Sequence, residues 1–177
     1  MSEGILLEKV ARGALLPEAA RVARLQEALP QIRAAVDGET DEVAVLATLA
    51  CLLWETLPQT NWCGFYRVVA PGQLAVGPYQ GGMGCLRIPF GKGVCGAAAS
   101  QVATQRVPDV HAFPGHIACD DATRSELVIP LVARGRVQGV LDLDSPHLEA
   151  FSAGEAALLE GFLREPWMER LNWADLG

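Results

Sequence analysis

The sequence lacks the features that mark membrane-spanning and nucleic-acid-binding proteins. No stretch of it approaches about eighteen uninterrupted apolar residues, so a transmembrane helix is not expected. It has no long cluster of lysine and arginine, and its formal net charge of -7 opposes binding to a phosphate backbone. Glu3 and Glu8 interrupt what would be the apolar part of a signal peptide, so we expect the amino terminus to be retained. These absences predict a cytoplasmic protein that binds neither membranes nor nucleic acid.

Common metal-binding and nucleotide-binding motifs are also missing. No Cys-x2-Cys pair is present, which disfavours a zinc site built from Cys95, His116 and Cys119, and no metal is expected. Residues 91–93 (Gly-Lys-Gly) are too short for the Walker phosphate-binding pattern. Five cysteines, an odd number, fit poorly with a secreted disulfide scaffold in a chain of 177 residues that is 50% hydrophobic. In a reducing compartment such cysteines are core residues, metal ligands or redox catalysts.

The periodicity of apolar residues predicts helices at both ends of the chain and strands between them. Pro30 is expected to strain or break the first helix, and the residues near Asp41 resemble a cap at the start of the second. The expected helices cover residues 16–35, 41–57, 94–103 and a terminal segment beginning near 152, and the expected strands cover 61–69, 74–79, 85–90, a short stretch near 107, 126–133 and 137–144.

This order of elements predicts an α+β fold. Strands joined by tight turns favour an antiparallel sheet, and helices grouped at the two chain ends favour a layer packed on one face of that sheet. Residues 111–125 show no periodicity and form a long loop, of the kind that is commonly functional in a compact domain.

Five short motifs carry a resemblance to a known family. They occupy residues 61–66, 77–81, 85–96, 115–120 and 139–145. Three cysteines accompany them at fixed intervals, with ten positions from Cys85 to Cys95 and twenty-four from Cys95 to Cys119. In these features the chain closely resembles the free methionine-(R)-sulfoxide reductases, whose domain is of the GAF type.

The resemblance implies a single GAF-like domain and a specific reaction. The expected organisation is an N-terminal helical segment over residues 1–40, a catalytic domain over 41–163 and a C-terminal tail over 164–177. The expected reaction is the thioredoxin-dependent reduction of the R epimer of free methionine sulfoxide by a homodimer, with no bound cofactor and with thioredoxin as the external reductant. The resemblance makes Cys119 the nucleophile and Cys85 the resolving thiol, with Cys95 as a further recycling thiol.

The residues alone leave the identity of the nucleophile open. Cys95 stands at an expected helix N-terminus beside Lys92, where the helix dipole and the lysine would lower its pKa, whereas Asp120 and Asp121 would raise the pKa of Cys119. Electrostatics therefore favours Cys95, and the resemblance favours Cys119. Cys51 and Cys63 are expected to be core residues.

Three carboxylates are expected to meet at one end of the sheet. Side chains alternate along a strand, so Asp142 and Asp144 share a face, and a hairpin centred on Gly135 would place Glu126 opposite Asp144 and Val128 opposite Asp142. Like charges this close raise at least one pKa, which would leave an acid able to protonate the departing sulfoxide oxygen. The same cluster would attract the α-ammonium of a free amino acid, unless Glu126 instead faces water.

Two aromatic residues are candidates for the wall of the substrate site. Trp62 and Tyr66 share a strand face with Gly64, and aromatic rings suit a methyl-thio group, although an aromatic pair at this spacing is more often part of the core. The alternative function is a ligand-sensing or redox-sensing GAF module without turnover.

Overall fold

The structure is a computed structural model that describes residues 7–115 and 121–174. In chain order its elements are α1 (Glu18–Ala35), α2 (Glu42–Thr56), β1 (Trp62–Ala70), β2 (Gln73–Gly81), β3 (Arg87–Pro89), α3 (Gly93–Gln101), β4 (Gln105–Val107), η1 (Val110–Ala112), β5 (Ser125–Ala133), β6 (Arg136–Ser145), α4 (Ala153–Leu163) and η2 (Met168–Arg170). None of the described helices has the length and apolarity that a bilayer crossing requires.

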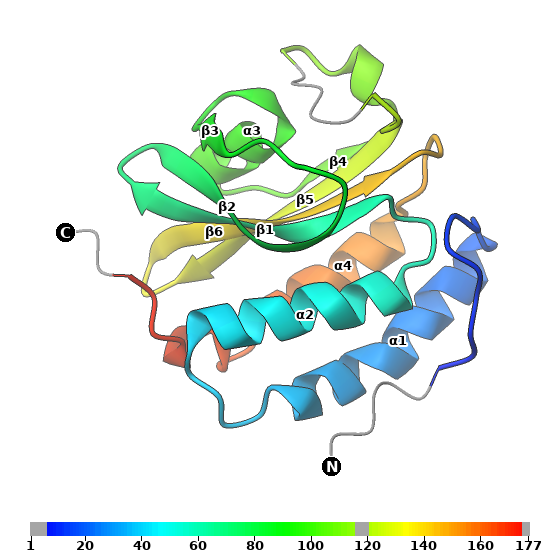
Figure 1. Cartoon of the computed structure of the whole chain (residues 1–177), viewed down its shortest axis with the longest axis horizontal. Coiled ribbons are helices and arrows are strands. Elements are labelled where there is room, and N and C mark those ends of the chain that lie inside the picture. The colour runs from blue at the N-terminus through cyan, green and yellow to red at the C-terminus, as the bar shows by residue number, and fades with distance from the viewer. Residues whose placement is uncertain (1–6, 116–120, 175–177) are drawn as a thin grey trace.

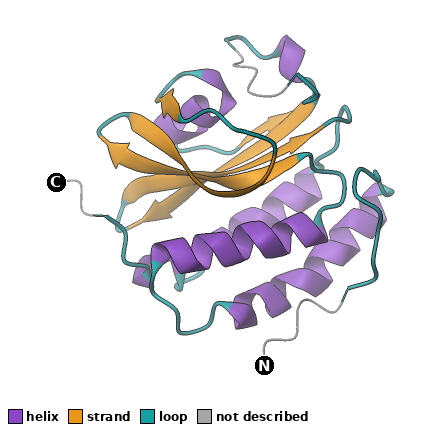
Figure 2. Ribbon diagram, viewed as in Figure 1, coloured by secondary structure: helices purple, strands orange, loops and turns teal. Residues whose placement is uncertain are grey.

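One antiparallel sheet of six strands organises the molecule, in the order β3-β2-β1-β6-β5-β4. Helices α1, α2 and α4 form a layer on one face, and α3 lies on the other (Figures 1 and 2). The predicted α+β fold, with an antiparallel sheet and terminal helices on one face, is confirmed. The sheet separates two apolar clusters, of which the larger fills the space under the three helices.

The helices follow the sequence signals with one exception. Asp41 caps α2, since its carboxylate accepts a hydrogen bond of 2.8 Å from the backbone N–H of Ala44. Ser152 and Glu155 form a reciprocal capping box at the start of α4. The expected break at Pro30 is wrong, because α1 continues through it to Ala35. Pro30 lies on the exposed side of the helix, where water can hydrate the carbonyl that loses its N–H partner.

A buried ion pair ties the helical layer to the start of the sheet. The Arg21 guanidinium donates to both oxygens of Glu155 at 3.1 Å, and the Gln59 side-chain amide donates to Glu155 at 3.0 Å. The backbone carbonyl of Gln59 in turn accepts a hydrogen bond of 2.7 Å from the Ser145 hydroxyl at the end of β6. Helices α1 and α4 are thereby joined to the segment that leads into β1 and to the end of β6. These contacts fix the position of the helical layer relative to this end of the sheet.

The turn between β5 and β6 determines which side chains face the site. Arg134 and Gly135 form a two-residue connection with positive φ values of 53° and 71°, as a type I′ turn requires. The pairing shifts by one residue beyond the turn, because Gln138 is an extra residue on β6. The sequence predicted a longer connection, yet the bulge restores the register expected for a hairpin centred on Gly135. Asp144 therefore pairs with Glu126, and the predicted register is confirmed.

Candidate functional site

A small pocket with a cavity volume of about 40 Å³ lies between α3 and the sheet face opposite the three-helix layer. Acidic, sulfur-containing and aromatic side chains line it together, a combination that does not occur in an ordinary apolar core. The lining residues are Trp62, Tyr66, Met83, Gly84, Ile88, Lys92, Gly93, Val94, Cys95, Thr123, Glu126, Asp142 and Asp144.

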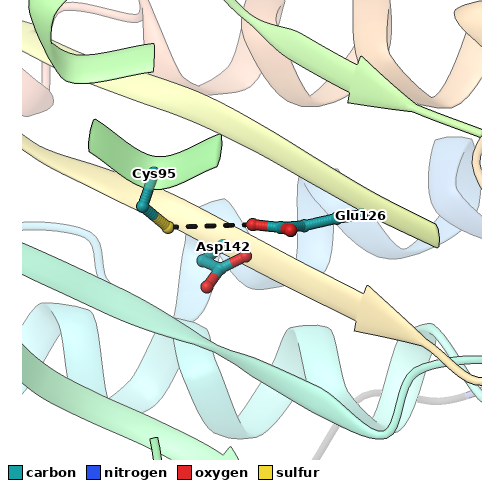
Figure 3. Close-up of side chains that lie close together, drawn as sticks. All are labelled: Cys95, Glu126 and Asp142. Atoms are coloured by element: carbon teal, nitrogen blue, oxygen red, sulfur yellow. Dashed lines mark hydrogen bonds between the residues drawn. The ribbon is translucent and has the colours of Figure 1, made fainter. Parts of the chain in front are cut away.

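The acidic end of the pocket is built by the β5–β6 hairpin. Leu141 and Leu143 point into the core under the helices, so the alternation of the strand sends Asp142 and Asp144 to the pocket. Glu126 joins them from the neighbouring strand, as predicted. Helix α3 adds Cys95, whose thiol donates to Glu126 Oε1 at 4.0 Å (Figure 3).

Burial changes the protonation of this cluster. Burial raises the pKa of Glu126 well above its usual value, and the charges of Asp142 and Asp144 add to the rise. Burial also raises the pKa of Asp142 to about 7, while hydrogen bonds from Cys95 and Glu126 oppose the rise. The predicted direction is confirmed, but desolvation contributes more than the repulsion between carboxylates from which it was predicted. At neutral pH the cluster therefore retains protons that exposed carboxylates would have lost.

The electrostatic argument for Cys95 as the nucleophile is wrong. The thiol is buried, and burial together with Asp142 and Glu126 raises its pKa well above the usual value. Lys92, which was expected to lower that pKa, is exposed at the N-cap of α3. Desolvation and two neighbouring carboxylates outweigh the helix dipole, so Cys95 stays a protonated thiol at neutral pH.

Aromatic rings form the wall on the side of β1. Trp62 stacks on Tyr66 with ring centroids 5.5 Å apart and on Tyr79 with centroids 5.1 Å apart. Gly64 lies between Trp62 and Tyr66 on the strand, and a methyl group at this position would collide with Tyr79 and lie 2.8 Å from the Trp62 ring. The predicted shared face is confirmed, and the stack depends on a residue without a side chain. Tyr79 was not predicted as part of this wall.

The segment leading to Cys85 packs against the same rings. A methyl group on Gly84 would lie 2.9 Å from the Tyr66 hydroxyl and 3.2 Å from the Trp62 ring, so this glycine allows close approach. The backbone N–H of Cys85 donates to the Tyr66 oxygen, an interaction that lowers the pKa of Tyr66 against the larger rise caused by burial. Tyr66 thus both lines the pocket and holds the backbone at Cys85.

The four described cysteines occupy different environments. Cys85 takes part in a disulfide, whereas Cys51, Cys63 and Cys95 are free thiols. Cys63 is buried in the core as predicted, but Cys51 is exposed on α2, so its assignment as a core residue is wrong. Helical periodicity alone did not show which side of α2 it occupies. Cys119 lies outside the described residues, as does His116.

Seven lining residues were not predicted as part of the site, namely Met83, Gly84, Ile88, Lys92, Gly93, Val94 and Thr123. Met83 stands in a glycine-rich link and Thr123 in the long loop, where no periodicity indicates direction. Val94 could have been found, because it lies next to Cys95 in the first turn of α3.

Known proteins are similar to this chain in sequence. The GAF domain family matches residues 24–165. The free methionine-R-sulfoxide reductase of Escherichia coli (strain K12) is 50% identical over 115 residues, covering 65% of this chain and 69% of that protein. The protein of the same name from Saccharomyces cerevisiae is 41% identical over 143 residues, covering 77% of this chain and 79% of that protein.

Solved structures are similar in fold as well. The X-ray structure of free methionine-R-sulfoxide reductase from Neisseria meningitidis, in complex with its substrate, has a TM-score of 0.80 and 41% identity, covering 92% of this chain and 95% of that chain. The reduced form of the Staphylococcus aureus protein fRMsr has a TM-score of 0.77 and 38% identity, covering 82% and 93%.

Proposed function

Because the chain belongs to the GAF family and, within it, to the free methionine-R-sulfoxide reductases, we propose that it reduces free L-methionine-(R)-sulfoxide to L-methionine. The observation that carries this proposal is the composition of the pocket. Glu126, Asp142 and Asp144 lie at one end, and Trp62 and Tyr66 form the wall along β1. A free amino acid with a methylsulfinyl group presents a cation and an apolar methyl group that match these two ends.

The carboxylates explain a preference for the free amino acid. An α-ammonium group is charged and carries three donors, so a buried acidic cluster binds it through charge-assisted hydrogen bonds. A methionine sulfoxide inside a peptide has an amide in place of this cation and gains nothing from the cluster. Asp144 is partly exposed at the pocket, which makes it the carboxylate we assign to the α-ammonium.

The raised pKa values suit the remaining carboxyls to a proton transfer. Reduction of a sulfoxide requires a proton for the departing oxygen, and an acid donates it best when its pKa is near the working pH. Glu126 and Asp142 both have raised pKa values, and that of Asp142 is about 7. We assign Glu126 and Asp142 to the sulfoxide oxygen, one as the proton donor and the other as its hydrogen-bond partner.

The sulfur chemistry uses two thiols in sequence. The Cys119 thiolate takes the oxygen from the sulfoxide, giving methionine and a Cys119 sulfenic acid once the oxygen is protonated. The Cys85 thiolate then attacks the sulfenic sulfur and forms a Cys85–Cys119 disulfide, and the displaced hydroxide takes up a proton and leaves as water. A disulfide at Cys85 and the free thiol at Cys95 support this assignment of the first resolving step, with Cys95 as a recycling thiol.

Thioredoxin would return the two thiols to the reduced state. Its dithiol supplies both electrons by exchange with the disulfide, so the chain needs no bound cofactor of its own. A supply of reduced thioredoxin also fits a cytoplasmic location. We further propose that the enzyme acts as a homodimer, in keeping with its family.

A coupled assay tests the reaction. Oxidation of NADPH is followed through thioredoxin reductase and thioredoxin, with free L-methionine-(R)-sulfoxide, the S epimer and a peptide sulfoxide as substrates. Turnover is expected only with the free R epimer. Absence of turnover with that substrate contradicts the proposal and leaves a sensing module as the alternative.

Single-turnover experiments test the roles of the residues. Cys119→Ser should release no methionine, whereas Cys85→Ser should release about one equivalent and then stop. Asp144→Asn should lower kcat/KM by about 10-fold to 100-fold through loss of a charge-assisted hydrogen bond. Asp37→Asn is the matched control, because the Asp37 side chain is 69% exposed and lies at the end of α1, outside the pocket lining. Equal kcat/KM values for Asp144→Asn and the control would refute the assignment of Asp144.

A further inference from the structure

We propose that Cys95, Glu126 and Asp142 form a binding site for a single borderline-soft divalent cation, of which Zn²⁺ is the best match. One atom from each side chain, the Cys95 sulfur and one oxygen of each carboxylate, lies within 4.8 Å of the other two. Figure 3 shows the three groups converging from α3, β5 and β6. This set differs from the zinc site considered in the sequence, because it replaces two ligands from the long loop with two strand carboxylates.

The spacing is close to what a tetrahedral ion requires. Metal–sulfur and metal–oxygen bonds of about 2.3 and 2.0 Å place the ligand atoms roughly 3.3 to 3.6 Å apart. The Cys95 sulfur and Glu126 Oε1 are 4.0 Å apart, and all three ligand atoms lie within 4.8 Å of one another. Coordination therefore needs contractions of about 0.5 to 1.5 Å, which rotation of the side chains can supply. The three residues are only 3%, 6% and 5% exposed, so they are already withdrawn from competing water.

An unpaired oxygen provides independent support for a cation. Asp142 lines the pocket, and although its carboxyl group has hydrogen bonds with Cys95 and Glu126, its buried Oδ1 has no hydrogen-bond partner among residues 7–115 and 121–174. A buried carboxylate oxygen without a donor is costly, and a metal ion is one of the few groups that can satisfy it. The only basic side chain among the described lining residues is the exposed Lys92, so no buried cation already serves this oxygen.

The donor set selects the class of ion. Metal binding displaces the Cys95 proton to the solvent, and the resulting thiolate with two carboxylates favours Zn²⁺ and its neighbours over Mg²⁺ and Ca²⁺, which prefer oxygen ligands alone. Three protein ligands leave the fourth position open toward the pocket, as in sites where zinc keeps an exchangeable ligand. Bound there, the ion would occupy the space assigned above to the sulfoxide oxygen and would compete with the substrate. The competition between the ion and methionine sulfoxide rests on the proposed function, whereas the binding of the ion itself does not.

Titration with Co²⁺, a spectroscopic substitute for Zn²⁺, tests the site. The protein used is the Cys85→Ser/Cys119→Ser variant, in which neither proposed redox thiol can bind the metal. We expect one equivalent of Co²⁺ to produce a sulfur-to-cobalt charge-transfer band and the intense visible bands of tetrahedral cobalt. Zn²⁺ should displace the Co²⁺ and abolish both. Absence of the charge-transfer band overturns the proposal.

Further variants in the same background assign the ligands. Cys95→Ser should remove the charge-transfer band, and Asp142→Asn should weaken Co²⁺ binding at least tenfold. Cys51→Ser is the control, because Cys51 is the exposed thiol on α2 and its loss should change nothing. A band that survives Cys95→Ser, or that disappears with Cys51→Ser, refutes the site. Circular dichroism of each variant checks its folding, and loss of the band counts only for variants that retain the wild-type spectrum.

The outcomes for metal and reaction are separable. Co²⁺ binding is measured without substrate. A protein that binds Co²⁺ yet fails to reduce methionine sulfoxide would therefore support the metal site and contradict the proposed function. If the reaction is confirmed, Zn²⁺ should raise the KM of the wild-type enzyme in the coupled assay with kcat unchanged. A fall in kcat at constant KM contradicts competition at the pocket.

Discussion

Replacement of Asp142 by Asn should make the free energy of unfolding depend less on pH. Burial raises the pKa of Asp142 from its usual value of 3.8 to about 7 in the folded protein. Between these two pH values the native state holds a proton that the unfolded chain has released. Stability contributed by this group is therefore fully present below about pH 4 and is lost as the pH rises through about 7.

The size of the effect follows from the difference in pKa. About three pKa units at 1.36 kcal/mol each correspond to about 4 kcal/mol lost between pH 4 and pH 8. For a chain of this length the same loss lowers the midpoint of thermal unfolding by about 10 °C. Asp142→Asn keeps the shape of the side chain and cannot ionise, so it should lack this share of the pH dependence.

Urea denaturation at pH 5, 6, 7 and 8, under constant reducing conditions, measures the difference. The free energy of unfolding of the wild type should fall more steeply than that of Asp142→Asn, with similar m-values. The exposed variant Asp37→Asn should retain the wild-type slope, which separates burial from the general effect of removing one negative charge. Parallel slopes for wild type and Asp142→Asn would refute the reasoning.

Two further predictions concern the aromatic wall. Gly64→Ala should destabilise the fold by about 3 kcal/mol in urea denaturation, because its methyl group would collide with Tyr79. Gly161→Ala, whose methyl group would meet nothing within 4 Å, should instead stabilise α4 by up to about 1 kcal/mol. Similar values for the two variants would contradict the packing argument. Tyr66→Phe removes the oxygen that accepts the Cys85 N–H, so steady-state turnover in the coupled assay should fall about tenfold while the first equivalent of methionine is still released at near the wild-type rate. If both rates fall together, Tyr66 does not act through Cys85.

Local patterns were sufficient to predict much of the sheet and part of the site. Alternation along β6 placed Leu141 and Leu143 in the core and the intervening aspartates in the pocket. The hairpin brought Glu126 to them in the predicted register, although the compensating bulge was not foreseen. A strand pattern repeats every two residues and a tight turn fixes its partner, so sequence alone carries this information.

Properties that depend on distant parts of the chain were not predictable. The pKa of Cys95 was predicted from its own helix, but it is determined by carboxylates from β5 and β6 and by burial under the sheet face. Pro30 was expected to strain or break α1, and its exposed position explains why the helix continues. Cys51 likewise required knowledge of which side of α2 faces the core.

The extra residue Gln138 on β6 has a consequence for how this site tolerates insertion and deletion. Because Gln138 pairs with no residue of β5, its removal would straighten the hairpin and leave the pairing from Leu131–Gly139 to Glu126–Asp144 unchanged. Deletion of a paired residue between Gly139 and Asp142 would instead shift the alternation of β6 by one position, so that aspartates and leucines would exchange faces of the sheet. Insertions and deletions among related sequences are therefore expected in connections that do not change which side chains of β6 face the pocket.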